Sequence, residues 1–143
     1  MPIKIPTYED FYNYNGLHCH RLWEELDDGW ICPSCKRSKY QIMRWAKRNP
    51  KSPSAFYDWV ACLHRHHDHA QGIMNTNKGR FSETIICDQC NSADGVAKRK
   101  LNLPKNFSFS PEEISFFVIA IPHGKHKVDT AIAKIIYDSI SQN

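Results

Sequence analysis

Two Cys-x-x-Cys pairs constrain this chain more than any other feature of its sequence. Cys32 and Cys35 form the first pair, and Cys87 and Cys90 form the second. Two residues between cysteines allow both sulfurs to reach one ion at about 2.3 Å, and two such turns complete a tetrahedral shell around zinc. We therefore expect these four residues to bind a structural zinc ion, because four protein ligands leave no open position for a substrate.

The composition narrows the setting in which these cysteines act. The chain has 143 residues, six Cys and eight His, and no apolar run long enough to cross a membrane. Its first residues, MPIKIPTYED, contain no apolar signal core, so we expect a reducing cytosol. Paired cysteines there indicate metal binding or catalysis, and a thioredoxin-type redox pair would need a βαβ pattern that is absent. Cys19 and Cys62 remain, and we expect them to pack in apolar surroundings.

The net charge of +4 conceals a strong asymmetry along the chain. Residues 31–105 carry fourteen basic and five acidic side chains, whereas residues 1–30 are acidic and residues 106–143 are nearly balanced. A basic segment around Cys and His motifs indicates a polyanion-binding protein, although a solvated surface that only aids solubility would look the same. The candidate DNA-binding residues are Arg37, Lys39, Arg44, Lys47, Arg48, Arg65, Arg80 and Lys98.

The apolar patterning predicts a mixed α+β fold. We expect two short helices within 7–27, strands at 40–46, 56–63 and 83–86, a helix over 91–100, and helices over 111–119 and 128–140. Asn91 or Ser92 would cap the middle helix, and Ser110 followed by Pro111 is a strong helix start. The last two helices would add a core layer or form a dimer contact.

These elements suggest three segments within a single compact domain. An N-terminal helical segment covers 1–29, a zinc-bound core covers 30–105, and a C-terminal helical extension covers 106–143.

Histidines concentrate between the two cysteine pairs. His64, His66, His67, Asp68 and His69 follow an apolar strand. Histidine can act as a base near neutral pH and can bind metals. In a strand, His64 and His66 share one face, and His67 and His69 share the other. The cluster could therefore hold a metal ion on one face with a base beside it, and a solvated polar loop is the alternative.

The string also fits the H-x-H-x-D-H signature of the metallo-β-lactamase superfamily. That superfamily needs a four-layer sandwich with further His and Asp ligands downstream. A chain of 143 residues is too short for it, and only His123 and His126 follow the cluster.

Residues 30–101 resemble the HNH, or ββα-metal, nucleases, and in particular the phage endonuclease VII branch. That branch has C-x-x-C, a strand ending in D-H-D-H-x-x-G, a basic residue, a short apolar strand and C-x-x-C-N. The matching residues here are Cys32-x-x-Cys35, His66-His67-Asp68-His69-Ala70-Gln71-Gly72, Arg80, Thr84-Ile85-Ile86 and Cys87-x-x-Cys90-Asn91. His66 departs from the branch, which has Asp there, but other HNH enzymes use His.

The resemblance implies a ββα-metal core of the HNH or treble-clef-like type in residues 30–105. His67 would be the general base, and a Mg²⁺ or Mn²⁺ ion would lie between His66 and Asn91. His69 would contact the phosphate or assist the metal, and Arg80 would hold a neighbouring phosphate. The roles of Asp68 and His64 stay open. DNA would be the partner, in the cytoplasm of a bacterial or phage-infected cell.

Two classes of function remain. The first is a metal-dependent DNA endonuclease of the homing, restriction or phage type. The second is a non-catalytic zinc-knuckle protein that binds nucleic acid. Since cutting both strands usually requires two active sites, the C-terminal helices could form a homodimer; no membrane partner is expected.

Overall fold

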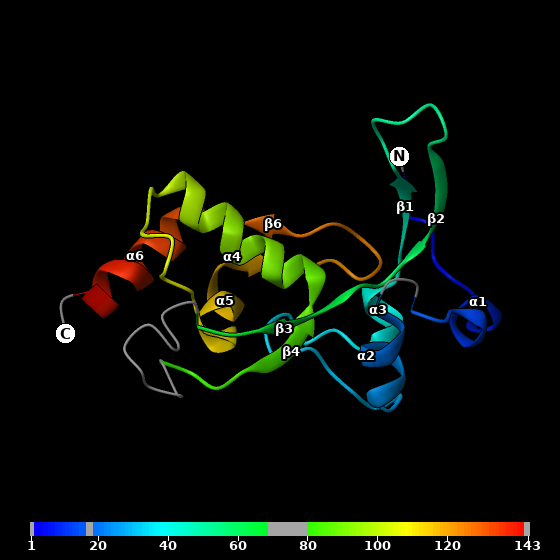
Figure 1. Cartoon of the computed structure of the whole chain (residues 1–143), viewed down its shortest axis with the longest axis horizontal. Coiled ribbons are helices and arrows are strands. Elements are labelled where there is room, and N and C mark those ends of the chain that lie inside the picture. The colour runs from blue at the N-terminus through cyan, green and yellow to red at the C-terminus, as the bar shows by residue number, and fades with distance from the viewer. Residues whose placement is uncertain (1, 17–18, 69–79, 142–143) are drawn as a thin grey trace.

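The computed structural model of the chain describes residues 2–16, 19–68 and 80–141 and has a mixed α+β fold (Figure 1). The elements are α1 (Tyr8–Asn13), α2 (His20–Glu25), α3 (Lys39–Ile42), β1 (Arg44–Arg48), β2 (Phe56–Val60), β3 (Leu63–His66), β4 (Thr84–Cys87), α4 (Asp88–Lys100), α5 (Pro111–Phe117), β5 (Val118–Ile119), β6 (Lys127–Val128) and α6 (Thr130–Ser141). No helix in these ranges combines the length and the apolar character that crossing a membrane requires.

The described strands pair as three separate antiparallel hairpins, β1–β2, β3–β4 and β5–β6. In the second hairpin, Leu63 lies opposite Cys87 at one end and His66 lies opposite Thr84 at the other. Helix α4 follows β4 without an intervening residue, with Cys87 as its N-cap. The β3–β4 hairpin therefore has a cysteine at one end and a histidine at the other, and it continues directly into helix α4.

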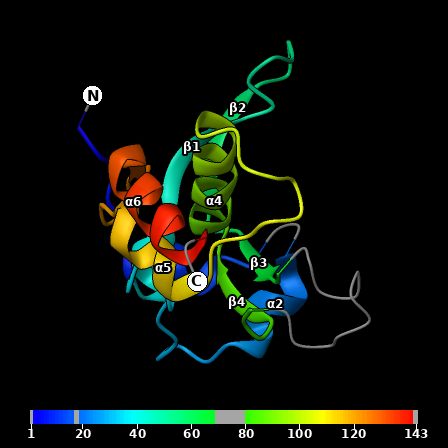
Figure 2. The ribbon, with the colours of Figure 1, turned by 90° about the vertical axis from the view of Figure 1, so that its left-hand side faces the viewer.

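Helix α4 lies at the centre of the molecule. It packs against β3 and β4 on one side and against α5, α6 and β6 on another (Figure 2). Its buried residues are Cys90, Ala93, Asp94 and Ala97, which recur at the three- and four-residue spacing of one helix face. The basic residues of its last turn, 98–100, lie where the helix dipole favours positive charge.

The C-terminal extension contributes a layer of the core. Phe109, Ile114, Phe117 and Ala133 are fully buried, and they belong to one buried cluster that also contains Trp23 and the cysteines. The last two helices, α5 and α6, therefore add a layer to the core, because they pack against α4. The dimer contact stays a prediction.

Capping residues explain where several helices begin. The Ser110 hydroxyl accepts a hydrogen bond from the Glu113 backbone N–H at 3.1 Å, and the Glu113 carboxylate accepts one from the Ser110 N–H at 2.7 Å. This capping box, with Pro111 at the first helical position, confirms the predicted start of α5. Thr7 and Asp10 form the same arrangement at α1, as their spacing predicts.

Other predicted boundaries were wrong, and specific hydrogen bonds explain two of them. Residues 39–42 form α3 instead of the start of a strand, because Ser38 and Gln41 form a capping box. The strand predicted over 56–63 is broken after Val60, where the Ala61 N–H donates to the Tyr14 hydroxyl at 2.9 Å. At the C-terminal end, residues 118–119 and 127–128 pair as β5 and β6, so α5 ends earlier and α6 begins later than predicted.

The core predicts a sharp contrast between two adjacent phenylalanines. Phe117 is fully buried and packs edge-to-face on Phe109, whereas Phe116 is 62% exposed. Phe117→Ala should lower the free energy of unfolding by about 3–5 kcal/mol, because it removes a large buried side chain and leaves a cavity. Phe116→Ala should change it by no more than about 0.5 kcal/mol. Urea denaturation followed by circular dichroism measures both, and equal effects would contradict the core assignment.

Candidate functional site

The two cysteine pairs converge on one point, as their spacing predicts. Cys32 and Cys35 lie in a tight turn that is closed by the Lys36 N–H donating to the Cys32 carbonyl at 2.9 Å. Cys87 ends β4, and Cys90 lies in the first turn of α4. The four sulfur atoms lie within 4.8 Å of one another. The cluster could hold a structural metal such as zinc.

Two of the sulfur–sulfur distances match those of a tetrahedral zinc site. Cys32 Sγ lies 3.9 Å from Cys90 Sγ, and Cys35 Sγ lies 3.8 Å from Cys87 Sγ. A tetrahedron with bonds of about 2.3 Å to a central zinc ion has sulfur–sulfur edges of about 3.8 Å. Hydrogen bonds from the neighbouring thiols lower the pKa of Cys35, whereas contacts within the same cluster raise the pKa values of Cys87 and Cys90, so the sulfurs titrate together as one group.

Arg37 lies beside the sulfur cluster and not on the surface. It is 3% exposed, its Nε donates to Cys35 Sγ at 3.3 Å, and its Nη2 lies 3.6 Å from Cys87 Sγ. Its Nη1 donates to the Ile121 carbonyl at 3.0 Å. Four thiolates around Zn²⁺ would carry a net negative charge, and the buried Arg37 guanidinium would offset that charge and help to orient the sulfurs. The prediction that Arg37 contacts DNA is therefore corrected.

His126 is a neighbour of the cluster that the sequence did not indicate. Its Nε2 lies 3.4 Å from Cys90 Sγ, and its backbone N–H donates to the Gln89 side chain at 2.7 Å. The Gln89 amide in turn donates to the Gly124 carbonyl at 3.1 Å. Together with Arg37, these bonds attach the segment between β5 and β6 to the sulfur cluster.

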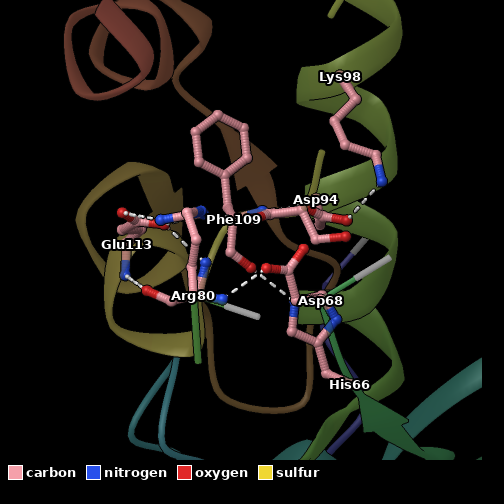
Figure 3. Close-up of polar contacts among 9 residues, drawn as sticks. His66, Asp68, Arg80, Asp94, Lys98, Phe109 and Glu113 are labelled. Carbon is pink, nitrogen blue, oxygen red and sulfur yellow. Dashed lines mark hydrogen bonds and ion pairs between the residues drawn. The ribbon is translucent and has the colours of Figure 1, made fainter. Parts of the chain in front are cut away.

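His66, at the far end of β3, is buried and held on both sides. It is 1% exposed, stacks on Phe81 with ring centroids 5.2 Å apart, and its Nε2 lies 2.6 Å from the Phe109 carbonyl oxygen (Figure 3). A carbonyl oxygen only accepts, so Nε2 carries the proton, and in the neutral ring Nδ1 keeps its lone pair. A backbone carbonyl in this role is typical of metal-binding histidines, whose second nitrogen is the ligand.

Helix α4 reaches the same backbone through Asp94. Its Oδ1 accepts from the Phe109 N–H at 2.8 Å, and its Oδ2 lies 3.2 Å from Lys98 Nζ (Figure 3). The backbone of Phe109 thus joins β3 to α4, with the carbonyl on His66 and the N–H on Asp94. Asn91 lies one turn earlier on α4 and is half-buried. It is not the N-cap, because the helix begins at Asp88.

Asp68 and Arg80 lie together at the ends of the segment 69–79. The buried carboxylate of Asp68 accepts from the Arg80 backbone N–H at 2.7 Å. The Arg80 guanidinium donates to the Ser108 carbonyl and pairs with Glu113 at 3.0 Å (Figure 3). In this structure Asp68 therefore holds the backbone of Arg80, and the Arg80 side chain binds the C-terminal extension.

His67 and His64 are both partly buried. His67 Nδ1 lies 3.4 Å from the Arg65 carbonyl oxygen. His64 lies opposite Ile86 in the hairpin, and burial lowers the pKa of its ring. His69 lies outside the described residues.

Four further basic residues predicted to bind DNA are also engaged within the protein. Lys39 is 4% exposed, and its Nζ donates to the carbonyls of Trp23 and Leu26, so its prediction is corrected too. The other three form ion pairs, Arg65 with Glu25, Arg80 with Glu113 and Lys98 with Asp94. The remaining three, Arg44, Lys47 and Arg48, lie on β1.

Cys19 and Cys62 are half-buried neighbours. The Leu63 N–H donates to Cys19 Sγ at 3.3 Å, and the Cys19 thiol contacts the Gly16 carbonyl at 3.1 Å. A hydrogen bond from the Cys62 thiol lowers the pKa of Cys19 to about 6. Cys19 packs against the buried core, as expected, and its sulfur also takes part in these polar contacts.

Comparisons with models of protein families, with curated proteins and with solved structures found no match for this chain. Within the described residues, the four-cysteine cluster is the one group of three or more Cys, His, Asp or Glu side chains that could hold a metal. A divalent ion between His66 and Asn91 stays a prediction.

The contacts around the sulfur cluster predict that Arg37 raises the affinity of the cluster for a metal ion. Arg37→Gln should weaken zinc binding by about 10–100-fold, because it removes the charge and the donors that face Cys35 and Cys87. Arg99→Gln, at an exposed position late in α4, is the matched control and should leave zinc binding unchanged. Competition with a chromogenic chelator measures both, with folding monitored by circular dichroism. Equal zinc release from folded samples of both variants would contradict this role.

Proposed function

We propose that the chain is a metal-dependent DNA endonuclease of the HNH type. The observation that carries the proposal is the unit formed by β3, β4 and α4, which follow the β-β-α order of that family. The unit has the four-cysteine cluster at one end of its hairpin and His66 at the other. His66 lies three positions along the strand from Leu63, which is opposite Cys87, a distance of about 10 Å.

The tautomer of His66 supports a second metal site near the histidines. Its Nε2–H is committed to the Phe109 carbonyl, so Nδ1 is the nitrogen left to bind an ion. His66 and Asn91, with His69 assisting, are the expected ligands. A bound Mg²⁺ or Mn²⁺ ion would supply charge neutralisation at the phosphate and at the leaving 3′-oxygen.

His67 is the proposed general base. Its Nδ1 lies 3.4 Å from the Arg65 carbonyl oxygen, and a neutral imidazole can take a proton from water near neutral pH. The resulting hydroxide attacks phosphorus and the bond to the 3′-oxygen breaks. The 3′-oxygen takes a proton from a solvent water, so the products carry a 5′-phosphate and a 3′-hydroxyl. Because His67 follows the last residue of β3, the hairpin and the sulfur cluster fix its backbone.

A zinc-stabilised nucleic-acid-binding protein without catalysis is the second candidate. The burial of His66 and the internal ion pairs of Arg80 and Lys98 favour this second candidate. Side chains that only stabilise the fold would be buried and paired in the same way. This candidate needs the sulfur cluster and a basic surface, but it does not need His67.

Nicking of supercoiled plasmid separates the two candidates. The zinc-loaded protein should nick DNA when Mg²⁺ or Mn²⁺ is added, and His67→Ala should slow nicking by about 10²–10⁴-fold, because the general base is lost. His20→Ala, an exposed histidine on α2, is the control and should nick at the wild-type rate.

DNA binding by His67→Ala, measured without added divalent ions, should equal that of the wild type. Zinc-loaded wild-type protein that binds DNA but does not nick it would support the second candidate. Nicking by His67→Ala at the wild-type rate would remove His67 from the mechanism.

A further inference from the structure

The β1–β2 hairpin projects from the rest of the molecule. Figures 1 and 2 both show its strands and connecting loop extending away from α4, α5 and α6. We call residues 44–60 the hairpin arm. Its strands pair in a regular antiparallel register from Arg44 opposite Val60 to Arg48 opposite Phe56. Five paired residues give the arm a length of roughly 15 Å before its loop.

The base of the arm is fixed by aromatic packing. Trp59 belongs to the buried core, and its ring lies edge-on to Trp45 with centroids 5.0 Å apart. Lys4 Nζ lies 3.6 Å from the centre of the Trp45 ring, a cation–π contact that attaches the N-terminal segment to the arm. The arm therefore leaves the body as a braced element.

The outer half of the arm carries an exposed aromatic ring and a basic residue on each face. Directly opposed residues of an antiparallel pair share a face, so Lys47 lies beside Tyr57, and Arg48 lies beside Phe56 on the other face. Tyr57 is 50% exposed and Phe56 is 47% exposed. The Arg48 guanidinium lies 5.7 Å from the centre of the Phe56 ring.

The arm is strongly basic, and much of this charge is not neutralised by the protein. The arm contains one acidic residue, Asp58, and four basic residues, Arg44, Lys47, Arg48 and Lys51. In the described part of the chain, Arg44, Lys47 and Lys51 form no ion pair, whereas Arg65, Arg80 and Lys98 each pair with a carboxylate. Exposed aromatic rings interleaved with cations are the composition of surfaces that bind nucleic acids.

We propose that the hairpin arm enters the major groove of duplex DNA. The major groove of B-form DNA is about 12 Å wide and admits a two-stranded β-ribbon. Cations on both faces of the ribbon then reach the phosphates on both walls, and the rings of Tyr57 and Phe56 contact base edges. The major groove of A-form RNA is too narrow to admit such a ribbon. The choice of DNA rests on the proposed function, whereas the binding site itself is defined by the arm.

The test compares two double variants by fluorescence anisotropy. Lys47→Ala with Tyr57→Ala alters one face of the arm, and Lys134→Ala with Phe116→Ala removes the same kinds of exposed side chain from α6 and α5. The probe is a labelled 25-base-pair DNA duplex at several salt concentrations without added divalent ions. The arm variant should bind at least about tenfold more weakly, and its slope of log affinity against log salt should fall by about 0.9 for the lost lysine. The control variant should bind as the wild type does.

Three results would overturn the proposal, and each differs from a failure of the nuclease proposal. The first is equal DNA binding by both variants. The second is wild-type binding to an RNA duplex of the same length that is as tight as its binding to DNA. The third is an arm variant that binds DNA normally but has a changed oligomeric state in sedimentation experiments. DNA binding through the arm without any nicking would leave this site in place and remove the nuclease. Nicking with arm-independent binding would do the reverse.

Discussion

The contact among four sulfur atoms is the interaction on which the other parts of this structure depend. It joins a turn at residues 32–35 to the junction of β4 and α4, and the sulfurs of Cys35 and Cys87, 52 positions apart, lie 3.8 Å from each other. A structural zinc site supplies about 10–16 kcal/mol in small zinc-binding peptides. The whole stability of an ordinary domain is about 5–15 kcal/mol. The free energy of binding a metal here is therefore large enough to decide whether the core folds at all.

The C-terminal extension contacts both ends of the unit formed by β3, β4 and α4. At the sulfur end, Arg37 and Gln89 bind carbonyls of the segment between β5 and β6. At the histidine end, the Phe109 backbone bonds His66 and Asp94. Residues after 106 therefore help to set the position of His66. In the proposed enzyme, the extension would then be a positioning element of the active site.

Local rules predicted the features that depend on neighbours in the sequence. The spacing of the cysteines identified the sulfur cluster, and the Ser110–Pro111 pair identified the start of α5. Helix α3 was missed although its capping box is local, and the other missed features depend on distant partners. His126 is 36 positions from the Cys90 sulfur that it contacts, and the Tyr14 hydroxyl that ends β2 is 47 positions from Ala61. Counting charges placed Arg37 and Lys39 on a DNA-binding surface, because a count of charges does not show which ones are buried against carbonyl and sulfur acceptors.

The four cysteines, and no other side chain, are the proposed ligands of a single zinc ion. X-ray absorption spectroscopy at the zinc edge of the purified 143-residue chain tests this ligand set directly. The expected result is one zinc per chain, with four sulfur ligands at about 2.3 Å and His126 outside the coordination shell. Fewer than one zinc in folded protein would contradict the claim. So would a shell in which nitrogen or oxygen at about 2.0 Å replaces a sulfur.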